Sequence, residues 1–189
     1  MKLTDGRLVD DGFHRRLEVL ASLAQVDESV VGPLEFGSRL VAQLDEWLGV
    51  VYPFVAGRVP DLTDESDVRR MAATLSKFHT SLDRLGPVDL PSVAALRETD
   101  WVSGAEGFGR AQLLHGDFSA TNTLLVGGRV RVIDFDDCGY GPVEFDVGNT
   151  LYMVLFDASM SSRMRPYERF RSWFVDEYRS ESGRSVTDA

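Results

Sequence analysis

The stretch LHGDFSATN at residues 114–122, followed by IDFD at residues 133–136, decides how this sequence folds around its polar residues. Between the two lie short apolar runs at 123–126 and 130–133, joined by Gly127-Gly128. A glycine pair supplies the positive φ angles that a two-residue hairpin turn needs. The sequence therefore predicts a β-hairpin with polar side chains gathered at its open end.

Three oxygen-bearing side chains belong to that open end. Asp117 and Asn122 precede the first strand, and Asp134 follows the second strand, twelve residues after Asn122. Mg²⁺ prefers hard oxygen ligands and usually binds one or two carboxylates together with nucleotide phosphates, so Asn122 and Asp134 suit it. Asp117 is placed to accept the proton of an acceptor hydroxyl or to orient that hydroxyl. Phosphoryl transfer needs this set, because the protein mainly positions the acceptor and neutralises charge.

The same residues also have simpler explanations. Asp117 and Asn122 are common turn residues, and Asp134 is of a type that ends strands. His115, beside the loop, is of a kind that more often holds backbone than transfers protons. A metal-dependent hydrolase built on Asp117, Asp134 and Asp136 would need more ligands, preferably histidine, than this stretch offers.

Outward from the hairpin, apolar residues at three-and-four spacing predict helices. The predicted helical segments are residues 13–24, residues 66–82, a segment through Val147, Leu151 and Leu155, and a segment after Pro166. Asp64 or Ser66 can cap the helix over 66–82. His79 lies on the apolar face of that helix, so we interpret it as a core histidine rather than a metal ligand.

The segments between these helices predict one further hairpin and one loop. Residues 40–44 and 48–52 form two apolar runs, and the second ends at Pro53, which has no N–H to donate to a strand ladder. Residues 86–109 mix proline, glycine and isolated apolar residues, which predicts a loop with one short helix around 93–98.

Composition limits the function classes. At 189 residues the chain can bury one sizeable core, and its net charge of −10 argues against a nucleic-acid partner, which needs clustered Lys and Arg. The single cysteine, Cys138, excludes an internal disulfide and agrees with a reducing compartment. No apolar stretch is long enough to cross a bilayer, so we expect a cytoplasmic protein without a membrane partner.

The motif His115-Gly116-Asp117 with Asn122, followed by Ile133-Asp134-Phe135, resembles the catalytic and metal-binding motifs of the aminoglycoside phosphotransferase and choline kinase-like superfamily. The resemblance implies an α+β, protein-kinase-like fold, with a mostly helical C-lobe that carries the catalytic β-hairpin and a reduced N-lobe. By that resemblance Asp117 and His115 are catalytic, with Asp117 as the base. Asn122 and Asp134 are the Mg²⁺ ligands.

The resemblance also divides the chain into lobes. Residues 52–57 look like the family's hinge, whose backbone meets the adenine, so Tyr52 and Phe54 are expected to bind the nucleotide. A partial N-lobe then covers residues 1–55, and the helical C-lobe covers residues 56–189. We expect a chain truncated at both ends, since no glycine-rich hairpin precedes the first helix and the family usually continues with further helices.

Three further residues match the family by position. Lys2 stands sixteen residues before Glu18, a spacing compatible with the family's phosphate-binding lysine and its helix glutamate. Both are therefore expected at the nucleotide phosphates. Asp146 matches an aspartate that braces the catalytic loop, and it can also be read as a plain helix N-cap.

The expected function is that of an enzyme, an ATP- or GTP-dependent phosphotransferase that uses Mg²⁺ and takes a small hydroxyl-bearing molecule as acceptor. Asp136, Asp137 and Glu144 would draw a cationic acceptor. The alternative is a kinase-like remnant that binds a nucleotide or a partner without turnover. A homo-oligomer is compatible with either.

Overall fold

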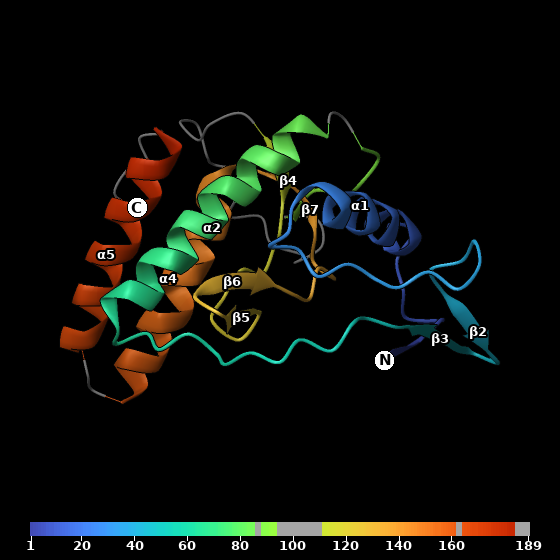
Figure 1. Ribbon diagram of the computed structural model, residues 1–189, viewed down its shortest axis with the longest axis horizontal. Helices are drawn as coiled ribbons and strands as arrows, with labels where there is room; N and C mark the ends of the chain where they lie inside the picture. Colours follow the sequence, from blue (N-terminus) through green and yellow to red (C-terminus); the bar gives the residue numbers. More distant parts are fainter. Residues whose placement is uncertain (86–87, 94–110, 162–163, 184–189) are drawn as a thin grey trace.

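The computed structural model describes residues 1–85, 88–93, 111–161 and 164–183 (Figure 1). The elements in chain order are β1 (Lys2–Asp5), α1 (Phe13–Val26), β2 (Ala42–Leu44), β3 (Trp47–Val50), α2 (Glu65–Arg84), β4 (Gln112–Leu114), β5 (Thr123–Val126), β6 (Arg129–Val132), β7 (Gly139–Gly141), α4 (Val143–Met160) and α5 (Met164–Ser182).

Helices α2, α4 and α5 gather at one end of the molecule, and the sheet of β1, β2 and β3 lies at the other (Figure 1). Asp64 is the N-cap of α2 and accepts a hydrogen bond from the Asp67 amide, so the predicted cap is confirmed. Helix α5 begins at Met164, before the predicted start after Pro166. A proline in the first turn costs no helical hydrogen bond, which explains the earlier start.

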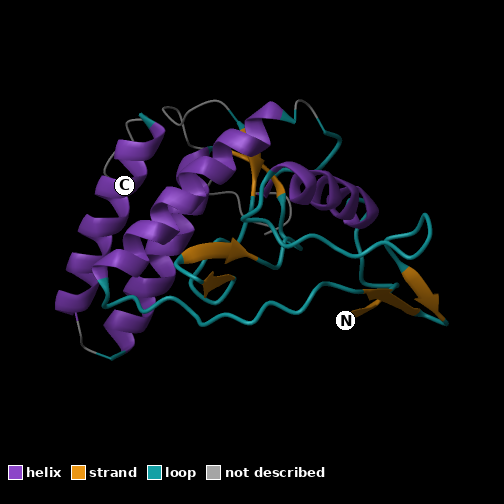
Figure 2. Ribbon diagram, viewed as in Figure 1, coloured by secondary structure: helices purple, strands orange, loops and turns teal. Residues whose placement is uncertain are grey.

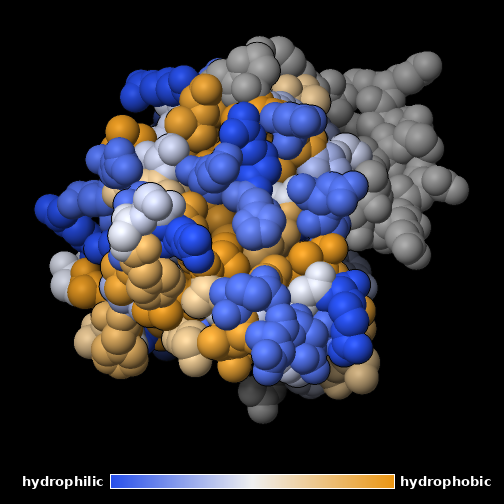
Figure 3. Space-filling view, turned by 90° about the vertical axis from the view of Figure 1, so that its right-hand side faces the viewer, coloured by the Kyte–Doolittle hydropathy of each residue, from blue (hydrophilic) through white to orange (hydrophobic). Residues whose placement is uncertain are grey.

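The N-terminal sheet has the strand order β1-β3-β2, with Lys2 opposite Val50 and Leu44 opposite Trp47. The hairpin of β2 and β3 was predicted, whereas β1 was not. This end of the molecule exposes apolar side chains of Leu3, Leu44 and Trp47 among polar ones, and Figure 3 shows the two kinds intermixed on its surface. A long extended segment leads from β3 to α2 (Figure 2).

The central hairpin of β5 and β6 forms as predicted, with Thr123 opposite Val132. Its turn residues Gly127 and Gly128 have φ angles of 55° and 82°. Both angles lie in the left-handed region, where glycine has no side-chain penalty. The turn chemistry thus fixes the register that brings residues 122 and 133 opposite each other.

One hydrophobic core joins α1, α2, the central hairpin and α5. It includes Leu20 and Leu23 of α1, Met71 of α2, Val132 of β6 and Phe174 of α5. Helix α1, counted with the N-lobe in the predicted division at residue 55, therefore packs into the same core as the C-terminal helices. The division itself stays a prediction.

Two further expectations concern a short helix and a membrane span. The short helix expected around 93–98 falls, apart from Val93, outside the described residues. In the described part of the chain, no helix is both long enough and apolar enough to cross a membrane.

Candidate active site

The loop between β4 and β5 carries the His-Gly-Asp motif, and its shape depends on Gly116. The φ angle of Gly116 is +84°, and a Cβ at this position would lie 2.0 Å from the backbone oxygen of Asp137. No side chain fits in that space, so any other residue would push the loop away from the segment after β6. The glycine thus lets the loop pack directly against the chain that follows Asp134.

Asp146, in the first turn of α4, is hydrogen-bonded to the backbone of this loop. Its carboxylate accepts hydrogen bonds from the amides of His115 and Gly116 and from Nε2 of His79, each at 2.9 Å. Burial alone would raise the pKa of the Asp146 carboxyl, but the hydrogen bonds from His79 and the backbone amides bring it below its usual value. The N-cap reading of Asp146 is wrong, because α4 begins at Val143 with Pro142 as its N-cap.

His79 is a satisfied core histidine, as interpreted from the sequence. Its ring is 1 % exposed, and its Nδ1 lies 2.7 Å from the hydroxyl of Tyr178 in α5. Because Nε2 contacts Asp146, the imidazole connects α2 and α5 to the loop that carries the His-Gly-Asp motif. The loop is therefore tied to helices that lie far from it in the sequence.

His115 is fully buried, with both ring nitrogens engaged by backbone. Nε2 donates to the carbonyl of Ile133 at 3.0 Å, and Nδ1 accepts from the amide of Asp117 at 3.2 Å. Burial lowers the pKa of His115, which favours the neutral ring that these two contacts require. Its ring also packs 4.6 Å from that of Phe135. His115 therefore links the loop, through the Asp117 amide, to the hairpin, through the Ile133 carbonyl.

Asp117 is held at both carboxylate oxygens by amide groups. Asn122 Nδ2 donates to Oδ2 at 2.9 Å, and Asn149 Nδ2 donates to Oδ1 at 3.2 Å. Sequence reasoning missed Asn149. The signal was its position three residues after Asp146, since residues three apart share a helix face. The structure thus brings Asp117 and Asn122 together and adds a second amide from α4.

Asp134 lies at the end of the hairpin beside Asn122. The Ile133 amide donates to the backbone oxygen of Asn122 at 3.0 Å, which sets the two segments side by side. Asp134 itself has a φ angle of +61°, a left-handed conformation that is uncommon for residues other than glycine. The backbone turn at Asp134 redirects its side chain at the point where the strand ends.

Lys2 contacts Asp134 and Asp136, and it does not pair with Glu18. Its Nζ lies 2.8 Å from Asp134 Oδ1 and 2.6 Å from Asp136 Oδ2, whereas Glu18 pairs with Arg15 on the same helix. Burial works against the charge, but the two aspartates outweigh it and raise the pKa of Lys2. Strand β1 holds Lys2 in this place through its pairing with β3.

The predicted hinge residues lie in different surroundings. Tyr52 is partly buried and lines a small pocket with Phe135, Leu17 and Leu20. Burial, helped by the nearby charge of Asp136, raises the pKa of its phenol to about 12. Phe54 is 92 % exposed. The hinge therefore packs one side chain against the Asp-Phe motif and leaves the other in solvent.

A divalent cation fits the chemistry at the end of the hairpin. Asn122 uses its Nδ2 on Asp117, which leaves its Oδ1 as a neutral oxygen ligand, and Asp134 supplies a carboxylate already in contact with the positive charge of Lys2. Hard oxygens of this kind are what Mg²⁺ prefers. Among the described residues, no group of three or more His, Cys, Asp or Glu is arranged to hold a metal.

Comparison with known proteins gives matches to kinases of small molecules. The sequence profile of the phosphotransferase enzyme family matches residues 94–182. Methylthioribose kinase from Yersinia enterocolitica is 36 % identical over 83 residues, which cover 38 % of this chain and 20 % of that kinase. The aligned part is thus a minor share of that relative.

The fold matches solved kinase structures over nearly the whole chain. An amicoumacin kinase in complex with AMP-PNP, Ca²⁺ and amicoumacin has a TM-score of 0.75 at 19 % identity, covering 95 % of this chain and 65 % of that one. A microcompartment-associated aminopropanol kinase has a TM-score of 0.66 at 20 % identity, covering 98 % of this chain and 69 % of that one. The α+β, kinase-like fold expected from the motifs is confirmed. The chain spans about two thirds of the length of these kinases, and the part that matches the sequence profile of the phosphotransferase enzyme family includes Asp117, Asn122 and Asp134.

Proposed function

We propose that this chain is a phosphotransferase that moves the γ-phosphate of ATP or GTP to a hydroxyl of a small molecule. The observation that carries the proposal is the Asp117 carboxylate, held by Asn122 and Asn149 beside the hairpin end that bears Asp134. A fixed carboxylate next to oxygen ligands and a lysine can both position an acceptor and neutralise phosphoryl charge.

The residues divide the reaction between them. Asp117 orients the acceptor hydroxyl and receives its proton as the hydroxyl oxygen bonds to the γ-phosphorus, and the bond from that phosphorus to the nucleoside diphosphate breaks. His115 acts by position, because its ring holds the Asp117 amide and the Ile133 carbonyl. The two asparagines keep the carboxylate aimed while the acceptor binds.

The nucleotide would lie between the hinge and the hairpin. Asn122 and Asp134 would hold Mg²⁺, which supplies charge neutralisation at the phosphates. Lys2 would add a second positive charge there, and the backbone at Tyr52 and Phe54 would meet the base. The amicoumacin kinase, solved with AMP-PNP and Ca²⁺, supports a nucleotide and a divalent cation as co-substrate and cofactor. Glu18, which pairs with Arg15, remains a prediction at the phosphates.

A cationic acceptor is the finer part of the proposal. Asp136, engaged by Lys2, follows the hairpin, with Asp137 next to it and Glu144 at the start of α4. The negative charges of these three residues would draw an ammonium group on the acceptor. A transfer screen over amino sugars, choline-like alcohols and uncharged sugars tests this preference.

The proposal is tested first by binding and then by transfer. Nucleotide at 100 times its dissociation constant should stabilise the chain by roughly 2.7 kcal/mol in a thermal-shift series, and the shift should depend on Mg²⁺. Asp117→Asn should lower transfer by roughly 10²- to 10⁴-fold while leaving nucleotide binding intact. Asp134→Asn should weaken Mg²⁺-nucleotide binding itself.

Asp157→Asn is the matched control, because Asp157 is exposed on α4 and lies outside the catalytic loop. It should change neither binding nor transfer. A Mg²⁺-dependent shift without transfer to any acceptor would favour the non-catalytic, nucleotide-binding remnant. Equal behaviour of Asp117→Asn and the control would remove Asp117 from the mechanism.

A further inference from the structure

The chain leaving the hinge lies against the outer edge of β5. The Arg58 amide donates to the carbonyl of Leu125 at 3.1 Å, and the Leu125 amide donates to the carbonyl of Arg58 at 2.7 Å. A Cβ on Gly57 would approach the Val126 side chain to 2.9 Å and the Leu125 oxygen to 3.0 Å. Residues 57–58 therefore act as a short third partner of the central hairpin.

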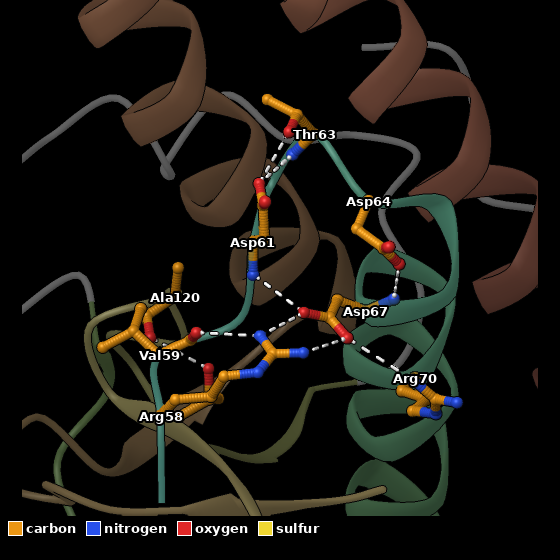
Figure 4. Close-up of polar contacts among 9 residues, drawn as sticks. Arg58, Val59, Asp61, Thr63, Asp64, Asp67, Arg70 and Ala120 are labelled. Carbon is orange, nitrogen blue, oxygen red and sulfur yellow. Dashed lines mark hydrogen bonds and ion pairs between the residues drawn. The ribbon is translucent and has the colours of Figure 1, made fainter.

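The side chain of Arg58 reaches in the other direction, to Asp67 in the first turn of α2 (Figure 4). Its two terminal nitrogens each donate to one oxygen of the Asp67 carboxylate, Nη2 at 3.0 Å. The same carboxylate accepts from the amide of Asp61 at 2.9 Å and from Arg70 at 3.4 Å. One carboxylate thus joins the hinge exit, the following loop and the start of α2.

This contact is buried at its Asp67 end, although the Arg58 side chain is 57 % exposed. The Asp67 side chain is 2 % exposed, and the hydrogen bonds of Arg58 keep the pKa of its carboxyl below the usual value. A two-pronged guanidinium–carboxylate contact is directional as well as strong. Removing Arg58 would take two hydrogen bonds from the buried Asp67 carboxylate and leave it to the Asp61 amide and the longer contact with Arg70, which costs more than losing an exposed pair.

The hairpin clamped in this way carries the predicted metal ligands. Its other edge is held too, since the Val31 amide donates to the Val132 carbonyl at 3.0 Å and the Val132 amide donates to Ser29 at 2.6 Å. Between these edges, the Ile133 amide bonds Asn122 and closes the open end. A shift of β5 away from Arg58 would move Asn122 relative to Asp134.

We propose that Arg58 and Asp67 are positioning residues that hold the metal-binding hairpin in register, acting through Leu125 on Asn122 and Asp134. This inference rests on the proposed function for its consequence in nucleotide binding. By this proposal, the contact between Arg58 and Asp67 at the hinge exit helps to set the affinity for the metal. The effect is indirect, because neither residue touches the predicted ligands.

The first test reads the hairpin without any nucleotide. Amide hydrogen exchange at Leu125 and Ile133 should be faster in Arg58→Met than in the wild-type chain. The matched control is Glu65→Gln, which breaks the ion pair of Glu65 with Arg69 on the same turn of α2 without touching β5. Unchanged exchange at both amides in Arg58→Met would overturn the proposal.

The second test reads Mg²⁺-nucleotide affinity by calorimetry. Arg58→Met should weaken it by about tenfold or more, as expected when a residue behind metal ligands is lost, and Glu65→Gln should not. Arg58→Lys, which keeps the charge without the two-pronged contact, should fall between them and serves if Arg58→Met does not fold.

The two readouts separate the two proposals. Faster exchange with unchanged Mg²⁺-nucleotide affinity would make the pair merely structural and would overturn its positioning role. If the wild-type chain itself binds no Mg²⁺-nucleotide, the proposed function fails. Exchange at Leu125 and Ile133 then still decides whether Arg58 and Asp67 hold the hairpin.

Discussion

Asp146 and Lys2 contact different parts of the candidate active site and lie in contrasting surroundings. The Asp146 side chain is 0 % exposed and accepts hydrogen bonds from the amides of His115 and Gly116 and from His79. The Lys2 side chain is 38 % exposed and contacts the half-exposed Asp134 and Asp136. The buried donors around Asp146 cannot turn to water if they lose this carboxylate. The exposed ion pairs of Lys2 can be replaced by contacts with water or with another anion at little cost.

This contrast fits a division of labour in the proposed reaction. The side of Asp117 must be rigid, because an acceptor hydroxyl held in the wrong place does not react. The side of Lys2 must accommodate an incoming nucleotide, and an ammonium on two exposed carboxylates is free to turn to phosphates. If the difference is real, loss of the buried carboxylate should cost the protein much more stability than loss of the exposed lysine.

The largest effect is expected for Asp146→Ala. It leaves the amides of His115 and Gly116 and Nε2 of His79 without their acceptor, and each buried orphan costs about 1–3 kcal/mol. We expect the free energy of unfolding to fall by about 3 kcal/mol or more in denaturant titrations. Asp157→Ala, at an exposed position of the same helix, should stay within about 0.5 kcal/mol of wild type. A loss no greater than that of the control would show that the brace is not needed.

An intermediate effect is expected in acid. The pKa of Asp146 lies below its usual value in the folded chain, so the stability it contributes is complete above the unfolded pKa and is lost as pH falls through the folded one. Below about pH 4, the contribution of Asp146 to the fall in the free energy of unfolding approaches, but cannot exceed, about 1.4 kcal/mol per pH unit. Asp146→Asn should therefore show a shallower decline. Parallel wild-type and variant curves from unfolding at stepped pH would contradict this.

The smallest effect on stability is expected for Lys2→Met. Exposed ion pairs contribute less than about 1 kcal/mol, and salt screens them further. Denaturant midpoints should therefore differ little from wild type, and less at high salt. A loss as large as that of Asp146→Ala would mean that the two sides of the site are built alike.

The parts of the site that local sequence determines were predictable. The pair Gly127-Gly128 specifies a turn whose two residues both need a left-handed backbone conformation. That turn sets the register in which residues 122 and 133 lie opposite each other. The apolar spacing of α2 likewise placed His79 on a buried face. In both cases the information lies within one turn or one helix.

The remaining contacts depend on residues far apart in the chain. His79 meets Asp146 across 67 positions and Tyr178 across 99 positions, and no local pattern indicates those partners. Strand β1 was missed for the same reason, since its hydrogen bonds go to β3 rather than to a neighbouring segment. The contact of Lys2 with Asp134, which depends on this pairing, could likewise not be read from the spacing of Lys2 and Glu18.

The left-handed backbone of Asp134 restricts which amino acids could replace it in the course of evolution. Only glycine, asparagine and aspartate adopt that conformation readily, and of these only aspartate offers a carboxylate. Glutamate, with the same charge, would fit the chemistry but not the turn. A randomised library at this one codon, selected for folding alone, should therefore return glycine and asparagine beside aspartate. Selection for the proposed Mg²⁺-dependent transfer should return aspartate.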